Sequence, residues 1–168
     1  IHAAYRHLHG NCYVMDNERA AELESQLSHG SLSIREFVRA LVKRDFYKDR
    51  FFSVVSPHRG IELAFKHLLG RPPLHQQEIS AAIATQAAHG FDALVDSLVD
   101  SAEYSEVFGA DTVPYSRAWT SASGMPMINF VRMAALEQNF VTSDRNNGSA
   151  SKAWAESRPS LLAALAAA

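Results

Sequence analysis

The chain has 168 residues, of which 47% are hydrophobic and 20% charged, a composition typical of a globular domain with its own core and not of a disordered chain. Its single cysteine excludes an internal disulfide and argues against a cysteine-rich zinc module. No apolar run approaches the roughly 18 residues that a membrane-spanning helix requires. The sequence begins at Ile1, already on a helical pattern, so we expect that the natural N-terminus is missing and that no targeting segment can be judged.

The formal net charge of −2 hides a segmental pattern. Lys and Arg outnumber Asp and Glu by 11 to 8 in residues 1–72 and by 5 to 3 in residues 114–168, whereas residues 73–113 contain 7 acids and no Lys or Arg. Such polarity affects how a protein meets its partners more than how it folds.

Residues 17–44 can be drawn as a helix-turn-helix, but the acidic stretch and a pI near 6.5 argue against nucleic-acid binding.

Helical periodicity dominates the chain up to the irregular stretch that begins at residue 113. Apolar residues recur at i, i+3, i+4, i+7 and i+8 in residues 34–42, 61–69 and 91–99. Ser33 with Glu36 predicts one helix start, and Ser56 followed by Pro57 predicts another. Helix ends are predicted at four glycines, Gly10, Gly30, Gly70 and Gly90. Because no segment alternates with period two, we predict an all-α fold, a helical bundle of about six to nine helices.

The helical part contains an internal duplication. Residues 1–30 match residues 61–90 with 10 identities, and after a three-residue gap residues 34–51 match residues 91–108 with 5 identities in 18 positions. Two unrelated amphipathic helix sets would share apolar spacing, but they would not need glycine at matched places. The sequence therefore predicts two related halves.

A C-terminal extension is expected after the helical domain of residues 1–117. Residues 113–126 look irregular, a short helix is predicted near residues 128–140, and the polar residues that follow predict an extended, flexible tail to residue 168. The alternative for the helix-prone end of this 118–168 extension is a docking peptide that becomes ordered on a partner.

No catalytic constellation is recognisable in the sequence, which has no Gly-rich phosphate loop, no His-Glu-x-x-His pair and no Gly-x-Ser-x-Gly elbow. His7 and His9 point apart on a helix, which disfavours a metal site. His7 and its repeat equivalent His67 are expected to make packing or polar core contacts. Cys12 is expected to be a buried, unreactive thiol, with covalent attachment of a prosthetic group or a redox role as the alternatives. We expect no enzyme and no bound metal.

Equivalent helices of the two halves carry opposite charge at equivalent positions. Arg35, Arg39 and Lys43 recur every four residues away from the apolar stripe of the first half. The matched positions in the second half are Asp92, Asp96 and Asp100. Ordinary solvated surface is one interpretation, and directional docking of one basic and one acidic face onto different partner surfaces is the other.

Several motifs, in fixed order, resemble the phycobilisome linker-polypeptide domain. They are Gly10-Asn-Cys-Tyr-Val-Met15, Leu23-Glu-Ser-Gln-Leu27, Ser33-Ile-Arg-Glu-Phe-Val-Arg-Ala-Leu41, Glu62-Leu-Ala-Phe-Lys-His-Leu-Leu-Gly-Arg-Pro72 and Thr112-Val-Pro-Tyr-Ser-Arg117. The resemblance covers roughly residues 1–117, and residues 124–144 resemble more weakly the sequence that follows this domain in rod linkers.

The resemblance implies a non-enzymatic, all-helical linker in the central cavity of ring-shaped phycobiliprotein trimers or hexamers. Such linkers join rings into the phycobilisome light-harvesting antenna and tune bilin energies for directional energy transfer. The implied partners are the α and β subunits of phycocyanin, phycoerythrin or allophycocyanin rings and other linkers, and these subunits, not this chain, carry the bilins. The implied location is peripheral, on the cytoplasmic or stromal side of the thylakoid membrane of a cyanobacterium or a red-algal plastid.

Two sets of residues are candidates for such contacts. The candidates for binding charged partner surfaces are Arg35, Arg39, Lys43, Arg44, Lys48, Arg50, Asp92, Asp96 and Asp100. The candidates for lying near a bilin are the aromatic residues Tyr13, Phe52, Tyr115 and Trp119, for which a place in the core is the alternative. From a different class of function, the runner-up is a general helical adaptor that binds partner helices or peptides.

Overall fold

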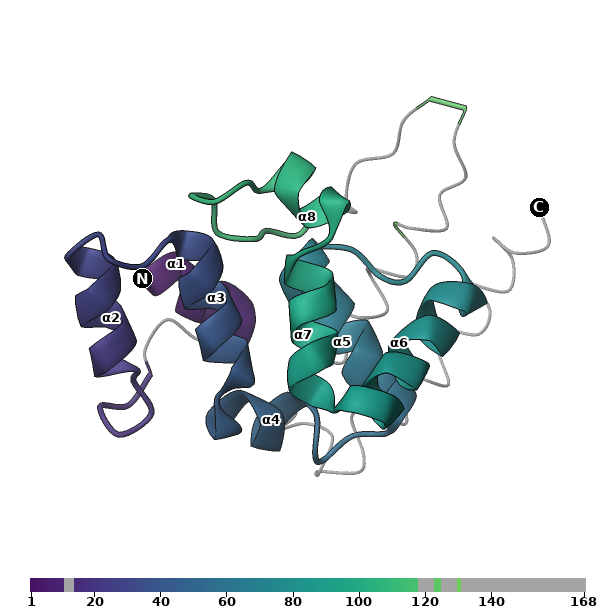
Figure 1. The fold of residues 1–168 in the computed structure, drawn as a ribbon, viewed down its shortest axis with the longest axis horizontal. Helices are drawn as coiled ribbons and strands as arrows, with labels where there is room; N and C mark the ends of the chain where they lie inside the picture. The colour runs from purple at the N-terminus through teal and green to yellow at the C-terminus, as the bar shows by residue number, and fades with distance from the viewer. Residues whose placement is uncertain (11–13, 118–122, 125–129, 131–168) are drawn as a thin grey trace, which may run out of the picture. The chain divides into compact units, whose positions relative to one another are not determined.

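The computed structural model describes residues 1–10, 14–117, 123–124 and 130 of the chain. Within those residues it contains eight α-helices and no strand, which confirms the predicted all-α fold (Figure 1). The helices are α1 (His2–His9), α2 (Ala21–Ser28), α3 (Ile34–Lys43), α4 (Asp45–Phe51), α5 (Pro57–Leu69), α6 (Gln76–His89), α7 (Phe91–Val99) and α8 (Ala102–Val107).

All eight helices belong to one compact unit, Ile1–Leu136. A second unit, Glu137–Ala168, lies wholly outside the described residues. The helix predicted near residues 128–140, apart from residue 130, and the tail predicted to residue 168 also lie outside them. The predicted boundary between residues 117 and 118 stays a prediction.

Serine side chains start three of the helices. The Ser33 Oγ accepts a hydrogen bond from the backbone N–H of Glu36 at 3.2 Å, and the Ser56 Oγ accepts one from the N–H of Arg59 at 3.4 Å. Each bond satisfies a donor of the first turn that has no partner within the helix. Both starts were predicted from the sequence, and Ser101 caps α8 in the same way.

Left-handed glycines end α1 and α5, as predicted. Gly10 has φ 73° and Gly70 has φ 66°, a conformation that glycine adopts at little cost. At Gly70 a second constraint applies, because a Cβ added there would lie 2.0 Å from the backbone oxygen of Tyr115. The segment of residues 111–117, which we call the strap, therefore crosses the end of α5 where only glycine leaves room.

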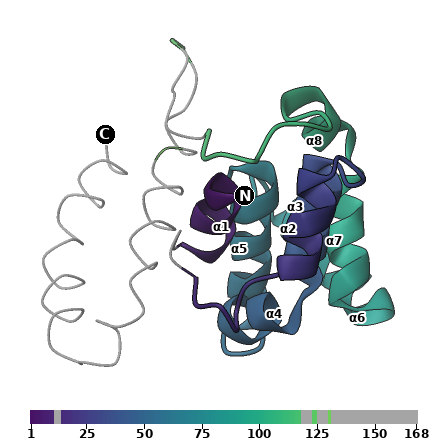
Figure 2. The same cartoon turned by 90° about the vertical axis from the view of Figure 1, so that its left-hand side faces the viewer.

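The helices α1 to α4 recur as α5 to α8, so the structure has the two related halves that the repeat predicts. Figure 1 shows α3 and α7 side by side, and Figure 2 shows α1 beside α5. Two matched pairs of residues contact each other directly: His7 with His67, and Arg39 with Asp96. Arg35 pairs with Asp100 and Arg39 with Asp96, so α3 and its equivalent α7 run antiparallel. Contact between equivalent residues on antiparallel helices indicates that the halves are related by an approximate two-fold axis.

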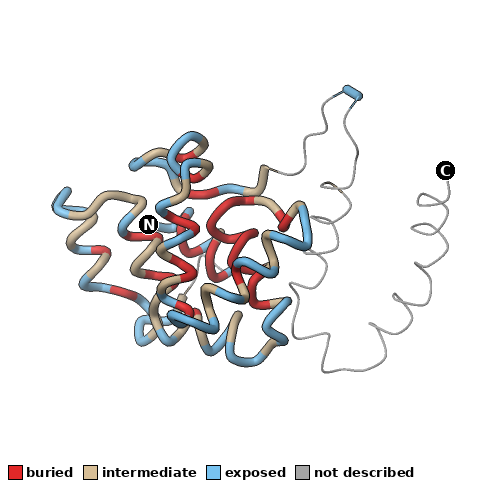
Figure 3. The backbone as a smooth tube through the Cα atoms, turned by 45° about the vertical axis from the view of Figure 1, so that its right-hand side comes forward, coloured by how far each residue is buried: buried red, intermediate tan, exposed pale blue. Residues whose placement is uncertain are grey.

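The core lies between these helices, as the buried backbone in Figure 3 shows. Every residue of the three predicted apolar stripes is buried except Ile34, which is partly buried. The core also holds polar groups with partners. The Tyr5 hydroxyl donates to the carboxylate of Glu24 at 2.8 Å and accepts from the N–H of Ala20 at 2.8 Å. Such pairing offsets the cost of removing these groups from water.

Candidate partner-binding surface

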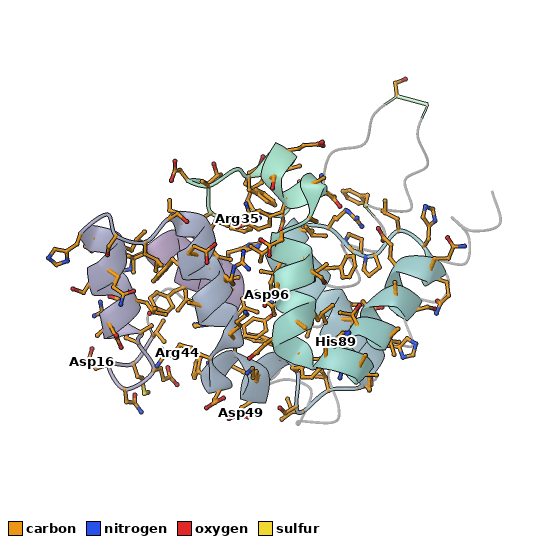
Figure 4. The ribbon with its side chains drawn as sticks, in the orientation of Figure 1. Asp16, Arg35, Arg44, Asp49, His89 and Asp96 are labelled. Carbon is orange, nitrogen blue, oxygen red and sulfur yellow. The ribbon has the colours of Figure 1, made fainter. Side chains whose placement is uncertain are left out.

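A row of ion pairs joins the first half of the molecule to the second. The Arg39 guanidinium donates to Asp96 at 2.8 Å and to Asp100 at 2.5 Å, and the Arg35 guanidinium donates to Asp100 at 2.8 Å. The Lys43 ammonium lies 2.6 Å from Asp96. We call these five residues the α3–α7 ladder; Figure 4 shows its members Arg35 and Asp96 between the two helices.

One more ion pair extends this row beyond the ladder. The Lys48 ammonium, on α4, lies 2.9 Å from the carboxylate of Asp92, at the start of α7. Positions 35 and 100 meet at one end of the row, and positions 48 and 92 at the other. The helices α3 and α7 therefore run antiparallel past each other.

The ladder is partly buried, which strengthens its electrostatics. Only 18% of the Arg39 side chain is exposed, although it faces three carboxylates, those of Glu36, Asp96 and Asp100. Hydrogen bonding from Arg39 holds the pKa of Asp100 below its ordinary value. A guanidinium with several carboxylate partners loses less conformational freedom per bond than isolated surface pairs do.

These contacts change the interpretation of the charged faces. Solvated surface and docking onto partners were the two interpretations of the basic face of α3 and the acidic face of α7, but in the structure the two faces meet each other. Seven of the nine residues predicted to bind charged partners are engaged in this way. Their binding to a partner stays a prediction, and any such partner must compete with the internal ion pairs.

The remaining two predicted basic residues lie near the start and the end of α4. Arg44 donates to the backbone oxygen of Glu18 at 3.2 Å, and the exposed Arg50 lies over the ring of Phe46 at 5.3 Å from its centroid. Among the described residues, neither guanidinium has a carboxylate partner. Arg6, which was not among the predicted residues, is exposed on α1 and likewise has no carboxylate partner among the described residues. These cations are better placed for external contacts than the ladder.

His9 lies buried beside these cations. Its ring packs 4.8 Å from the centroid of Phe46 and 5.3 Å from that of Tyr5, and neither ring nitrogen has a hydrogen-bond partner in the described part of the chain. Burial, together with the nearby charges of Arg50 and Arg44, lowers the pKa of His9 to about 4. The imidazole is therefore neutral at pH 7.

The described members of the aromatic set differ in exposure. Phe52 is half-buried and packs on Phe91 with ring centroids 4.3 Å apart, which supports the alternative of a place in the core. Tyr115, on the strap, is 52% exposed and rests edge-on against Phe108. Tyr13 and Trp119 lie outside the described residues. Tyr115 is therefore the more exposed of the two described candidates.

A second ionic cluster, which the sequence analysis missed, holds the strap in place. Arg71 donates to Glu103 at 2.6 Å and to Glu78 at 2.8 Å, and Arg117 also pairs with Glu103. The backbone N–H of Arg117 donates to the oxygen of Gly70 at 2.9 Å. From the sequence, Arg71 and the prolines after it marked only a helix end, so nothing there predicted a charged cluster of residues 71, 78, 103 and 117.

Among the residues that the structure describes, no helix has both the length and the apolar character needed to cross a membrane. No group of three or more His, Cys, Asp or Glu side chains among these residues is placed to hold a metal ion. His7 Nε2 donates to the backbone oxygen of His67 at 3.1 Å, and His67 Nδ1 lies 2.7 Å from the hydroxyl of Tyr47, so both histidines make the polar contacts expected of them. Cys12 lies outside the described residues.

Comparison with known proteins identifies the family. The model of the phycobilisome linker polypeptide family matches residues 1–117, which contain all eight described helices. The chain belongs to this family, as its motifs indicated. It is 52% identical over 153 residues to a phycoerythrin class 2 subunit gamma, linker polypeptide, of Synechococcus sp. (strain WH8020), an alignment that covers 90% of this chain and 52% of that relative.

Two proteins of Microchaete diplosiphon are also similar to the chain. A phycobilisome 27.9 kDa rod linker polypeptide, phycoerythrin-associated, is 44% identical over 82% of this chain and 55% of its own length. A 37.5 kDa rod linker polypeptide, phycocyanin-associated, is 40% identical over 92% of this chain and 58% of its own length. The chain thus spans about half the length of the relatives it matches.

Proposed function

We propose that this chain is the ring-binding part of a phycobilisome rod linker, which joins phycobiliprotein rings into the light-harvesting antenna. The observation that carries the proposal is the family match across residues 1–117, together with relatives whose names associate them with phycoerythrin or phycocyanin rods. Its partners are then the α and β subunits of such rings and other linkers. The role is assembly, not catalysis, and its place is the thylakoid surface.

The finer mechanism we propose is that of an asymmetric plug in a symmetrical ring. The two halves are related only approximately, because matched positions such as Arg39 and Asp96 carry opposite charge. Seated in the central cavity, such a plug contacts identical subunits through different side chains. Bilins carried by those subunits, with none attached covalently to this chain, then experience different surroundings and differ in energy, which gives energy transfer a direction.

Within this mechanism, Arg44 and Arg50 are the basic residues we assign to acidic ring subunits, because their charge is not consumed by internal carboxylates. Tyr115 is the residue we assign to a bilin environment, since about half of this residue is exposed. The ladder residues take a smaller part in docking, because their charges are paired within the chain.

The experiment is a titration of the chain against purified phycoerythrin and phycocyanin rings, followed by sedimentation with detection at visible wavelengths. Co-sedimentation of the chain with coloured rings, in saturable stoichiometry, supports the proposal. Sedimentation of a colourless chain alone, at every ring concentration and with both pigments, contradicts it and favours a general helical adaptor. Fluorescence emission of the complexes with wild type and with Tyr115→Leu then tests the assignment of Tyr115, for which the expected result is a shifted emission maximum.

A further inference from the structure

The α3–α7 ladder combines two facts that ordinary solvated surface does not explain. The three α3 positions 35, 39 and 43 are basic, and their repeat equivalents, Asp92 and Asp96 on α7 and Asp100 directly after it, are acidic. Five of these six side chains also contact each other across the approximate two-fold axis, with Arg39 paired to its own equivalent, Asp96. The sign of the charge thus changes between the halves at the place where the halves meet.

The two-fold relation determines what the alternative pairings look like. If the α3 face met the α3 face of a second chain in the same geometry, Arg39 would lie against Arg39, and Arg35 against Lys43. If two α7 faces met, Asp96 would lie against Asp96, and Asp92 against Asp100. The apolar stripes beside these charges have the same spacing in the two halves, whereas every ion pair of the ladder would become a repulsion.

We propose that the ladder is a recognition element by which the two halves select each other over themselves. The basic α3 face accepts only an acidic α7 face. In the native chain that face belongs to the same molecule, because the connection through residues 52–56 keeps its effective concentration high. When the internal pairing is made repulsive, the same rule directs each half to a complementary half of a second copy of this chain. The inference is independent of which rings the linker binds.

The test uses two variants of the full chain that are repulsive internally and complementary to each other. The acid-faced variant carries Arg35→Asp, Arg39→Asp and Lys43→Asp. The base-faced variant carries Asp96→Arg and Asp100→Lys, and it leaves the pair of Lys48 with Asp92 intact. A five-fold variant that carries both sets has the ladder restored with its polarity exchanged. A control for the net charge of the base-faced variant reverses two exposed carboxylates outside the ladder: Glu22→Lys and Glu106→Lys.

Each variant is measured alone, and the acid-faced and base-faced variants are also unfolded and refolded together, with mass determined by light scattering after size exclusion. We expect the five-fold variant and the control to match the wild type in mass and helicity, and each one-sided variant to lose helicity or thermal stability. The co-refolded mixture should give a 1:1 complex of twice the chain mass, formed by neither variant alone, with helicity recovered.

Two results would overturn the inference. One is a co-refolded mixture that contains no 1:1 complex, because complementarity between chains would then not direct pairing. The other is a one-sided variant that keeps the wild-type mass and stability, because opposed charges would then be unnecessary. If a one-sided variant does not fold alone, recovery of its helicity in the mixture remains a direct readout.

Discussion

Replacing Gly70 by alanine isolates the close approach of the strap to α5. The substitution places a methyl group 2.0 Å from the backbone oxygen of Tyr115, so the strap must move away. Movement breaks the backbone hydrogen bond from Arg117 to Gly70, worth about 1 kcal/mol, and the bond from the Arg117 guanidinium to Leu69, worth about as much. Left-handed alanine adds about 1 kcal/mol of backbone strain. We expect a loss of about 3 kcal/mol in the free energy of unfolding.

Gly30→Ala is the matched control, because Gly30 has a similar φ of 74° but no atom within 4 Å of an added Cβ. It should lose only the backbone term, about 1 kcal/mol. The entropy that alanine removes from the unfolded chain is shared by both variants and cancels in their difference. Urea unfolding followed by circular dichroism measures both values. Equal losses in the two variants would refute the idea that the strap is seated on Gly70.

Three further predictions concern individual side chains. Tyr47→Phe removes a hydroxyl that lies 2.7 Å from a nitrogen of buried His67, and it should lower the free energy of unfolding in urea by about 1–3 kcal/mol. Tyr104 stands at the matched position, and its hydroxyl has no hydrogen-bond partner among the described residues, so Tyr104→Phe should be neutral or stabilising. The pKa of His9 is about 4 in the folded chain, below its ordinary value of 6.5. The unfolded chain therefore takes up the proton first, and the free energy of unfolding falls as the pH drops from 6.5 towards 4. In His9→Leu the loss of stability between pH 7 and pH 5 should be smaller than in the wild type by about 2 kcal/mol. Arg50→Glu should weaken ring binding in the sedimentation titration and reduce its salt dependence, and an unchanged profile would remove that cation from the docking surface.

The fold was largely predictable, because its signals are local. The stripe of residues 91–99 is buried as its spacing requires, and Ser33 and Ser56 start helices because their side chains satisfy donors of the first turn. The duplication was visible because Gly10 and Gly70, which match in the repeat, both adopt the left-handed backbone conformation that favours glycine. Each of these inferences needs only a few neighbouring residues along the chain.

The candidate surface was harder to predict, because it depends on which helix packs against which. Periodicity places Arg39 and Asp96 opposite their apolar stripes, but it does not say that the two faces meet. A usable signal was present, since matched positions of opposite charge in a duplicated fold pair naturally across a two-fold axis. The strap cluster around Glu103 carried no such signal, because its members come from four separate segments.

The central claim, an asymmetric plug inside a symmetrical ring, is tested most directly by single-particle electron microscopy of rings reassembled with this chain and processed without imposed symmetry. Helical density for one chain inside the central cavity, touching equivalent subunits through different side chains, is the result we predict. Rings with an empty cavity, or with the chain bound to their outer rim, would contradict the account.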